Sequence, residues 1–290
     1  MEKLQKRIRK LKNPSMVCFC PDPEQVPQSY MERCKAPIQG YCAYAKDLLL
    51  SLKEIVSAVR FGFGDFALLG QEGLDVLAEL LNFACDQEYY VLLDAPEMWS
   101  PRQAELAANR LMCRESLWNF DGLLLSCYAG SDVLKPFTEK IKTAGKDIFV
   151  AVRTANKSAS EIQDLLTGSR LVYTAAADIV KRLGEGVLEH SGYSRVGIVG
   201  PATSSDALAA MRNKYPGTFI LVDGFDYSGA NAKICANAFD KLGHGAVACA
   251  GNYITQAWKE TDLFDPDPVE LAVAAAERMK KNLSRYVTIL

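Results

Sequence analysis

The feature that most constrains the fold is a regular alternation, along the whole chain, of short apolar runs with segments of helical periodicity. The runs are four to seven residues long and lack the polar alternation of a strand with one wet face, so they favour a parallel sheet covered on both sides. Eight runs, each leading into a helical segment, predict an α/β fold with a single (β/α)8 TIM barrel. The predicted strands are 16–20, 55–61, 90–94, 122–126, 148–152, 195–199, 218–222 and 246–249.

The chain carries no proline- or glycine-rich linker, so one domain over residues 1–290 is expected. Residues 1–13 are basic with helical spacing, and we expect them to cap the barrel floor. A loop at 265–268 leads to a C-terminal helix at 268–287, which Pro268 would start. A doubly wound open sheet is the alternative, but no glycine-rich dinucleotide turn follows the first strand. The other predicted helices are 72–85, 131–143, 161–166, 205–212 and 230–242.

Composition excludes several classes of function. The 290 residues carry a formal net charge of −2, which leaves no basic footprint for nucleic acid. No stretch reaches the roughly 20 apolar residues of a membrane span, and the N-terminal segment lacks the apolar core of a signal peptide, so a cytoplasmic protein is expected. Cys18 and Cys20 form the only close pair among nine cysteines, and none has metal-ligand spacing with His190 or His244. We therefore expect reduced thiols, with neither a metal nor another cofactor.

In barrels of this kind the active site lies at the C-terminal ends of the strands. The third predicted strand ends in Asp94 and continues through Ala-Pro-Glu-Met to Trp99. This stretch resembles the orotidine 5'-phosphate decarboxylases, in particular their longer bacterial branch, in which the strand ends in D-x-K-x-x-D. Asp94 matches the first acid, whereas Pro96 stands at the lysine and Trp99 at the second acid. The resemblance extends from Leu4 to about Trp258.

Scaffold positions of this family agree better than its reactive positions. After the second strand, both glycines of the family pattern F-F-E-x-x-G-x-x-G are present, as Gly70 and Gly73. Arg60 stands at a family lysine on that strand, where it keeps the positive charge but cannot deprotonate. Cys20 stands where the family carries an aspartate that touches the nucleotide.

Polar groups of the later strands are partly kept. Thr154 and Asn156 match the family segment T-S-N, which binds the pyrimidine, although Ala155 lacks the middle hydroxyl. Thr203 falls in a segment that resembles V-G-A-T, and Tyr128 matches a tyrosine that follows the fourth strand. The residues alone are equally consistent with Thr154 and Asn156 capping the following helix or satisfying loop amides. A tyrosine such as Tyr128 is more often a packed strand-end aromatic than a ligand platform.

The phosphate end of the implied site is altered most. Asn252 stands at the phosphate-binding arginine of the family, and Ser228 at the glutamine that contacts phosphate. Asp223 and Asp226 add negative charge, which would weaken attraction for a phosphate dianion or form a salt-bridge net with Arg153. The implied site therefore has Asp94 and Arg60 as catalytic remnants, and Thr154, Asn156, Thr203, Asp223, Asp226, Ser228 and Asn252 as ligand-binding positions.

The altered third-strand motif predicts loss of the family reaction. In the family, a lysine held between two aspartates stabilises the carbanion left by CO2 and then protonates it. Pro96 has neither an ammonium group nor a backbone N–H, and a positioned general acid is typically worth roughly 10²–10⁴ in rate. Trp99 is expected to fill part of the cavity. We therefore predict a decarboxylase-like pseudoenzyme that no longer makes UMP and is a non-catalytic binding or regulatory protein for a small molecule or nucleotide.

Two alternatives keep the chain an enzyme. In the first, a different small-molecule substrate binds a carboxylate-rich cup that would suit a metal or a cationic ligand. In the second, the chain is still a decarboxylase of pyrimidine biosynthesis and recruits a displaced lysine, for which Lys135 is the candidate. The family also implies a homodimer formed through the barrel mouth. The cup would comprise Asp94, Arg60, Glu97, Asp223 and Asp226.

Overall fold

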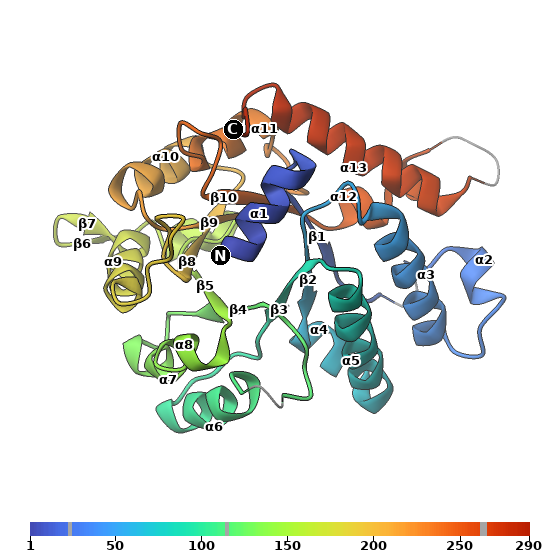
Figure 1. The fold of residues 1–290 in the computed structure, drawn as a ribbon, viewed down its shortest axis with the longest axis horizontal. Coiled ribbons are helices and arrows are strands. Elements are labelled where there is room, and N and C mark those ends of the chain that lie inside the picture. Colours follow the sequence, from blue (N-terminus) through green and yellow to red (C-terminus); the bar gives the residue numbers. More distant parts are fainter. Residues whose placement is uncertain (23–24, 114–115, 262–265) are drawn as a thin grey trace.

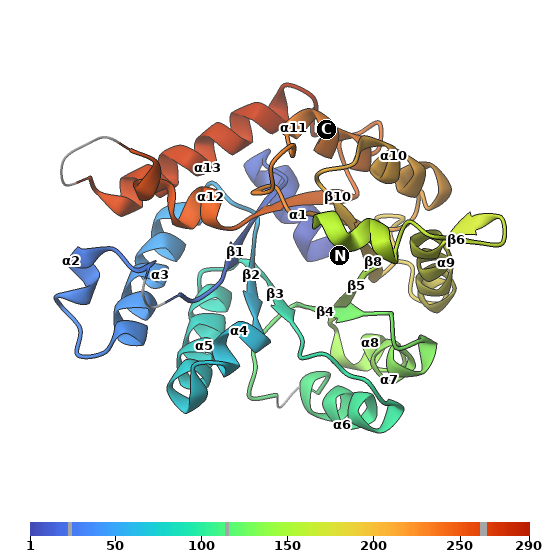
Figure 2. The ribbon, with the colours of Figure 1, turned by 180° about the vertical axis from the view of Figure 1, so that it is seen from behind.

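A closed barrel of eight parallel strands forms the centre of the computed structural model, which describes residues 1–22, 25–113, 116–261 and 266–290 (Figures 1 and 2). Neighbouring strands follow chain order around the barrel, and β10 closes it by pairing in parallel with β1. The predicted (β/α)8 fold is thus confirmed. The barrel strands are β1 (Ser15–Phe19), β2 (Ala58–Gly62), β3 (Tyr90–Asp94), β4 (Gly122–Ser126), β5 (Asp147–Ala151), β8 (Val196–Pro201), β9 (Ile220–Asp223) and β10 (Ala246–Ala250).

The strands form because their side chains are apolar on both faces and are covered by helices outside and by each other inside. The predicted bounds of β3 and β4 are correct, and those of the other strands shift by one to three residues. The largest shift is at β2, since Ile55 and Val56 donate their N–H groups to Leu52 O and finish the preceding helix. Between the barrel and its helices, the rings of Phe19 and Phe61 stack with centroids 5.1 Å apart, and Phe61 also contacts Phe66 of α4.

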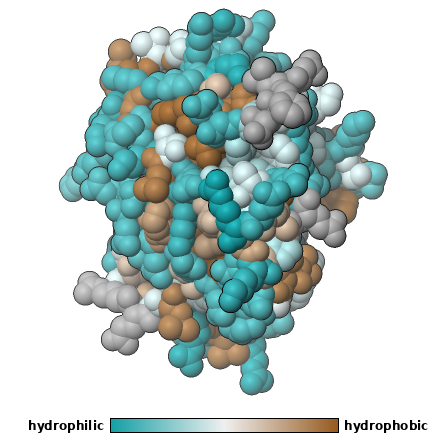
Figure 3. All heavy atoms as spheres, turned by 90° about the vertical axis from the view of Figure 1, so that its right-hand side faces the viewer, coloured by the Kyte–Doolittle hydropathy of each residue, from teal (hydrophilic) through white to brown (hydrophobic). Residues whose placement is uncertain are grey.

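Helices surround the barrel, and the flank that carries α2 and α3 presents mostly hydrophilic atoms, with apolar ones in small groups (Figure 3). Each long helix buries one stripe against the strands; α5, for example, buries Val76, Leu77, Leu80, Leu81 and Ala84. The helices are α2 (Gln28–Met31), α3 (Pro37–Leu52), α4 (Phe63–Ala67), α5 (Gly70–Asp86), α6 (Pro101–Leu111), α7 (Lys135–Thr138), α8 (Ile141–Ala144), α9 (Val172–Gly184), α10 (Ser205–Lys214), α11 (Ala232–Cys235), α12 (Asn252–Thr255) and α13 (Pro268–Ser284), with 3-10 turns η2 (Ser131–Val133), η3 (Lys157–Glu161), η4 (Ala236–Ala238) and η5 (Ala257–Glu260).

Three predicted helices differ from the structure. The helix expected at 161–166 is wrong: this segment leads into a hairpin of β6 (Leu166–Thr167) and β7 (Arg170–Leu171), and the long helix α9 follows it. Gly168 turns this hairpin with a φ of 64°. The segments at 131–143 and 230–242 each break into shorter helices; in the first, a proline at the start of α7 cannot continue a helix from η2.

Helix α1 (Glu2–Leu11) covers the N-terminal end of the barrel. Gln5 Oε1 accepts a hydrogen bond from Gly245 N before β10, and Arg7 Nε donates to Ser57 O before β2. At the other end of the chain, Asp267 caps α13 by accepting from two backbone N–H groups. Asp265, at the start of the predicted loop, lies outside the described residues. Within the described ranges, no helix combines the length and apolarity that crossing a bilayer requires.

Candidate binding site at the barrel mouth

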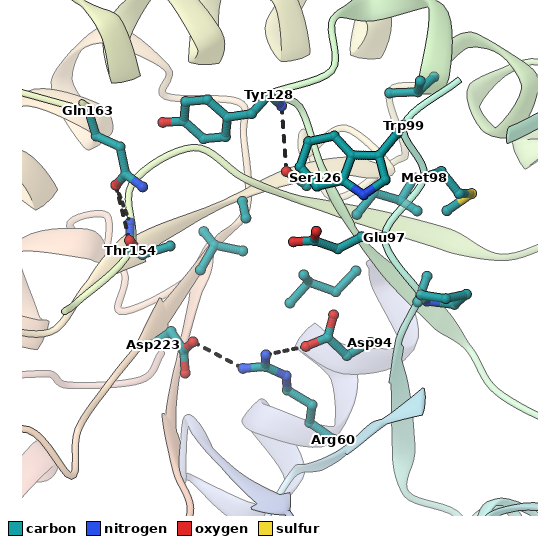
Figure 4. A pocket seen from close by; sticks show the side chains of 17 residues that line it. Arg60, Asp94, Glu97, Met98, Trp99, Ser126, Tyr128, Thr154, Gln163 and Asp223 are labelled. Carbon is teal, nitrogen blue, oxygen red and sulfur yellow. Dashed lines mark hydrogen bonds and ion pairs between the residues drawn. The ribbon is translucent and has the colours of Figure 1, made fainter. Parts of the chain in front are cut away.

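A cavity of about 360 Å³ opens at the C-terminal ends of the strands (Figure 4). Its walls come from β2, β3, β4, β5 and β9, and from the loop that follows β3, so it lies where barrels of this architecture hold their ligands. Its polar and aromatic lining consists of Arg60, Asp94, Glu97, Trp99, Ser126, Tyr128, Thr154, Gln163 and Asp223.

Arg60 is held between two acids at the base of this cavity. Its Nη1 donates to Asp223 Oδ2 at 3.0 Å, and its Nη2 forms a short ion pair with Asp94. Only 14% of the Arg60 side chain is exposed, and its Nε is buried without a hydrogen-bond partner. Strands β2, β3 and β9 thus place a rigid guanidinium between two carboxylates, and we refer to Arg60, Asp94 and Asp223 as the mouth triad.

Two members of the mouth triad, Asp94 and Arg60, have shifted pKa values. Burial raises the pKa of Asp94 above its usual value, and the Arg60 guanidinium offsets this only in part. Burial by itself lowers the pKa of Arg60, but the charges of Asp223, Cys18 and Asp94 outweigh it and the net shift is upward. Arg60 therefore keeps its proton. The cavity lining has one basic side chain, Arg60, and three acidic side chains, Asp94, Glu97 and Asp223.

A second polar group lies on the β5 side of the cavity. The Thr154 hydroxyl is 3.1 Å from Gln163 Oε1 and 2.6 Å from Asn156 Oδ1, and Thr154 N donates to Gln163 Oε1 at 2.8 Å. The Asn156 side chain caps no helix, so the capping alternative is wrong for this residue. Tyr128 lines the cavity, and its hydroxyl donates to Val152 O at 2.7 Å.

Asp226 lies apart from the mouth triad, in the loop after β9. Its two carboxylate oxygens accept hydrogen bonds from Gly251 N and Tyr253 N, both at 2.7 Å, at the start of α12. Asp226 and Asn252 line a separate hollow of about 610 Å³. Burial raises the pKa of Asp226, and the two amide bonds counteract the rise. The carboxylate of Asp226 thus occupies the backbone amides that follow the last barrel strand.

Comparison with known proteins shows which proteins this chain resembles in sequence and in fold. The chain is 29% identical over 290 residues to the orotidine 5'-phosphate decarboxylase of Rhodopirellula baltica, covering 96% of this chain and 93% of that protein. Sequence and fold relate this chain to the orotidine 5'-phosphate decarboxylases. A candidate orotidine-monophosphate-decarboxylase from Toxoplasma gondii superposes with a TM-score of 0.81 at 20% identity, over 99% of this chain and 98% of that chain. The OMP decarboxylase of Leishmania donovani gives 0.74 at 24%, over 97% and 98%. No protein-family model matches the chain.

The decarboxylase-like sequence after β3 forms the rim of the cavity. Pro96, Glu97 and Trp99 all line it, and the Trp99 ring lies beside Glu97 at the opening (Figure 4). Trp99 is 71% exposed, and its ring borders the opening of the cavity, which it does not block. Ser100 fixes this rim, because its hydroxyl accepts from Gln103 N and starts α6. The cavity above Asp94 therefore stays open.

Within the described parts of the chain, no lysine lines the mouth cavity. Lys135 lies outside the cavity, where its Nζ is 3.5 Å from Asp132 Oδ1 and its side chain is 55% exposed. The proposal that Lys135 replaces the family lysine is therefore wrong. Arg153 pairs with Asp164 at 2.7 Å and not with Asp223 or Asp226, so the salt-bridge net considered from the sequence does not form.

The predicted site residues lie in two separate cavities or in neither of them. Arg60, Asp94, Thr154 and Asp223 share the mouth cavity, whereas Asp226 and Asn252 share the neighbouring hollow. Asn156, Thr203 and Ser228 line neither of these two spaces, and the Thr203 hydroxyl is 3.4 Å from Ala155 O. Among the described residues, no three His, Cys, Asp or Glu side chains are arranged to hold a metal ion. Gln163 is a lining residue that sequence reasoning missed, because it lies in the segment expected to be helical.

Proposed function

We propose that this decarboxylase-like barrel binds a small neutral or cationic organic molecule in its mouth cavity and does not decarboxylate orotidine 5'-phosphate. The observation that carries the proposal is the mouth triad: the cation at the base of the cavity is an arginine already neutralised by Asp94 and Asp223. An open cavity above it supports binding, and the missing ammonium argues against the chemistry.

The proposed loss of chemistry follows from proton transfer. In the family, the ring carbanion is stabilised and protonated by a lysine, and Pro96 occupies the matching position at the rim. Arg60 is the cation nearest to that role, but an arginine with a raised pKa is a poor proton donor. Its two acid partners also hold the guanidinium at the base of the cavity.

The proposed ligand class follows from charge. Glu97 forms no hydrogen bond or ion pair with the rest of the described chain, and its carboxylate points into the cavity between Trp99 and the mouth triad (Figure 4). An ammonium or amide group would satisfy this acid, while Trp99 and Tyr128 offer apolar surface and a ring face for a cation. An anion would meet Glu97 and the two triad acids.

Orotidine 5'-phosphate decarboxylation is the second candidate. It is favoured by similarity to a decarboxylase of Rhodopirellula baltica over 96% of this chain. That candidate requires a proton source for the product carbanion other than a lysine of the described mouth.

An assay with orotidine 5'-phosphate separates the two candidates. We expect the purified protein to form no UMP above the level of an identically purified Asp94→Asn variant, as followed by loss of orotate absorbance and by chromatography. Asp94 is the matched position because it lines the cavity and pairs with Arg60 at its base. UMP formation by the unchanged protein that Asp94→Asn abolishes would establish decarboxylation and contradict the proposal.

Trp99 provides a direct readout of binding. Because its ring lies at the cavity rim, a bound molecule should change its fluorescence, whereas Trp118 packs edge-on against Phe63 and should not respond. We expect organic amines from a small panel to give a saturable change that Trp99→Phe removes, and UMP to give none. A saturable response to UMP without any response to amines would contradict the proposed ligand class.

A further inference from the structure

Three thiols meet on one side of the barrel mouth, next to the mouth triad. Cys18 lies near the end of β1, Cys20 just beyond that strand, and Cys249 on the adjacent strand β10. The Sγ atoms of Cys18 and Cys20 are 3.6 Å apart, and the Cys249 thiol is close enough to Cys18 to lower its pKa. All three are free thiols, and the proposed binding function uses none of them.

We propose that Cys18 and Cys20 form a peroxide-reactive thiol pair that closes to a disulfide. Residues two apart on an extended chain point to the same side, which explains why the two sulfurs meet. They must approach from 3.6 Å to the roughly 2.05 Å of a disulfide bond. Cys20 follows the last residue of β1, so the movement breaks no hydrogen bond of the barrel sheet.

The surroundings of Cys18 favour the reactive thiolate. Hydrogen bonds from Cys20 and Cys249 lower the pKa of Cys18, and burial opposes this less strongly. Arg60, its register partner on β2, contributes positive charge. The same contacts raise the pKa of Cys20 and of Cys249, so these two remain protonated donors. Cys18 is therefore the nucleophile, and Cys20 is the thiol that resolves the oxidised intermediate.

A route for a small oxidant exists on the Cys20 side. Cys20 is exposed and lines a hollow of about 630 Å³ together with Asp65, Leu68 and Leu69. Cys249 is only 1% exposed, so an oxidant does not reach it directly. Reaction is thereby directed to the pair and not to the third thiol.

The chemistry balances with hydrogen peroxide as oxidant. The Cys18 thiolate attacks one peroxide oxygen, the O–O bond breaks, and hydroxide leaves, so that Cys18 becomes a sulfenic acid. The Cys20 sulfur then attacks the Cys18 sulfur, the S–O bond breaks, and the Cys20 proton and the leaving hydroxide form water. Two thiols and one peroxide give one disulfide and two waters, and a dithiol reductant reverses the change.

Peptide mapping tests this pair against the isolated thiols Cys34 and Cys113, which are likewise partly exposed. The folded protein is treated with limiting hydrogen peroxide, alkylated without reduction and digested with trypsin, which releases residues 13–33 with both thiols of the pair. We expect this peptide to lose two hydrogens and both alkylation sites at least about tenfold faster than Cys34 or Cys113 is oxidised. Reduction should restore both sites.

A Cys20→Ser variant gives the second measurement, at an exposed position that leaves the barrel intact. Here Cys18 should accumulate as a sulfenic acid trapped by dimedone, because no partner resolves it. The proposal is overturned if Cys18 and Cys20 stay fully alkylated while Cys34 and Cys113 oxidise. It is also overturned if Cys18 of the variant reacts no faster than those isolated thiols.

Discussion

Replacing Arg60 by methionine is expected to lower the free energy of unfolding by about 2–3 kcal/mol. The substitution removes the guanidinium and leaves Asp94 and Asp223 facing each other at the base of the mouth. Breaking a fully buried pair in this way costs about 3–5 kcal/mol, and the partial exposure of the two acids reduces the loss. Urea unfolding of Arg60→Met and of the unchanged protein measures the difference.

Lys135→Met is the matched control, because it removes a cation from a solvent-exposed pair. Lys135 and Asp132 are 55% and 68% exposed, so the change should alter the free energy of unfolding by less than about 0.5 kcal/mol. Equal effects of the two substitutions would contradict a structural role for the mouth triad. Adding Asp94→Asn and Asp223→Asn to Arg60→Met should recover part of the loss, since it removes the unpaired charges.

The loss in free energy of unfolding caused by Arg60→Met should also depend on pH. The pKa of Asp94 is already raised by burial, and loss of Arg60 removes the opposing effect, so it rises further in the variant. A folded-state pKa above the unfolded value means that the native state binds the proton more tightly, and stability increases as the pH falls through that pKa. The difference in free energy of unfolding between the variant and the unchanged protein should therefore become smaller from pH 7 toward pH 5. A gap that widens on acidification would contradict this account.

Much of the barrel could be predicted from the sequence because its strands are buried on both faces and read as uninterrupted apolar runs. The hairpin of β6 and β7 could not be predicted, since strands of two residues are too short to show an alternation of apolar and polar residues. Its position inside an apparently helical segment also hid Gln163 and the pairing of Arg153 with Asp164, which are only 11 residues apart. Local errors in helix assignment thus became errors in the candidate site.

The mouth triad was only partly predictable. The pairing of Arg60 with Asp94 joins neighbouring strands and could be expected from barrel order, but Asp223 is 163 residues from Arg60. Its approach depends on how far each side chain reaches across the closed barrel, which no periodicity records. The role of Asp226 was hidden for a different reason: its partners are backbone N–H groups, and a residue pattern does not show where these point.

Asp226→Gly is expected to give this barrel an affinity for phosphate that the unchanged protein lacks. Barrel phosphate sites are commonly built from the loops after strands seven and eight and a short helix, which correspond here to the loops after β9 and β10 and to α12. In this chain the Asp226 carboxylate already accepts from Gly251 N and Tyr253 N. The Asp226 carboxylate is part of the chain, so a phosphate would have to displace it and would still lie close to its negative charge. Glycine removes both obstacles.

Each freed amide can donate one charge-assisted hydrogen bond, which is worth about 1.5–3 kcal/mol. After the cost of ordering the loop, we expect the dissociation constant for inorganic phosphate and for UMP to fall at least about tenfold, as measured by phosphorus NMR titration. Asp226→Asn is the matched control, because it removes the charge but leaves a side chain of the same size over Gly251 N and Tyr253 N. Tight phosphate binding by the unchanged protein, or an equal gain in both variants, would show that the tethered carboxylate does not exclude phosphate by occupying these amides.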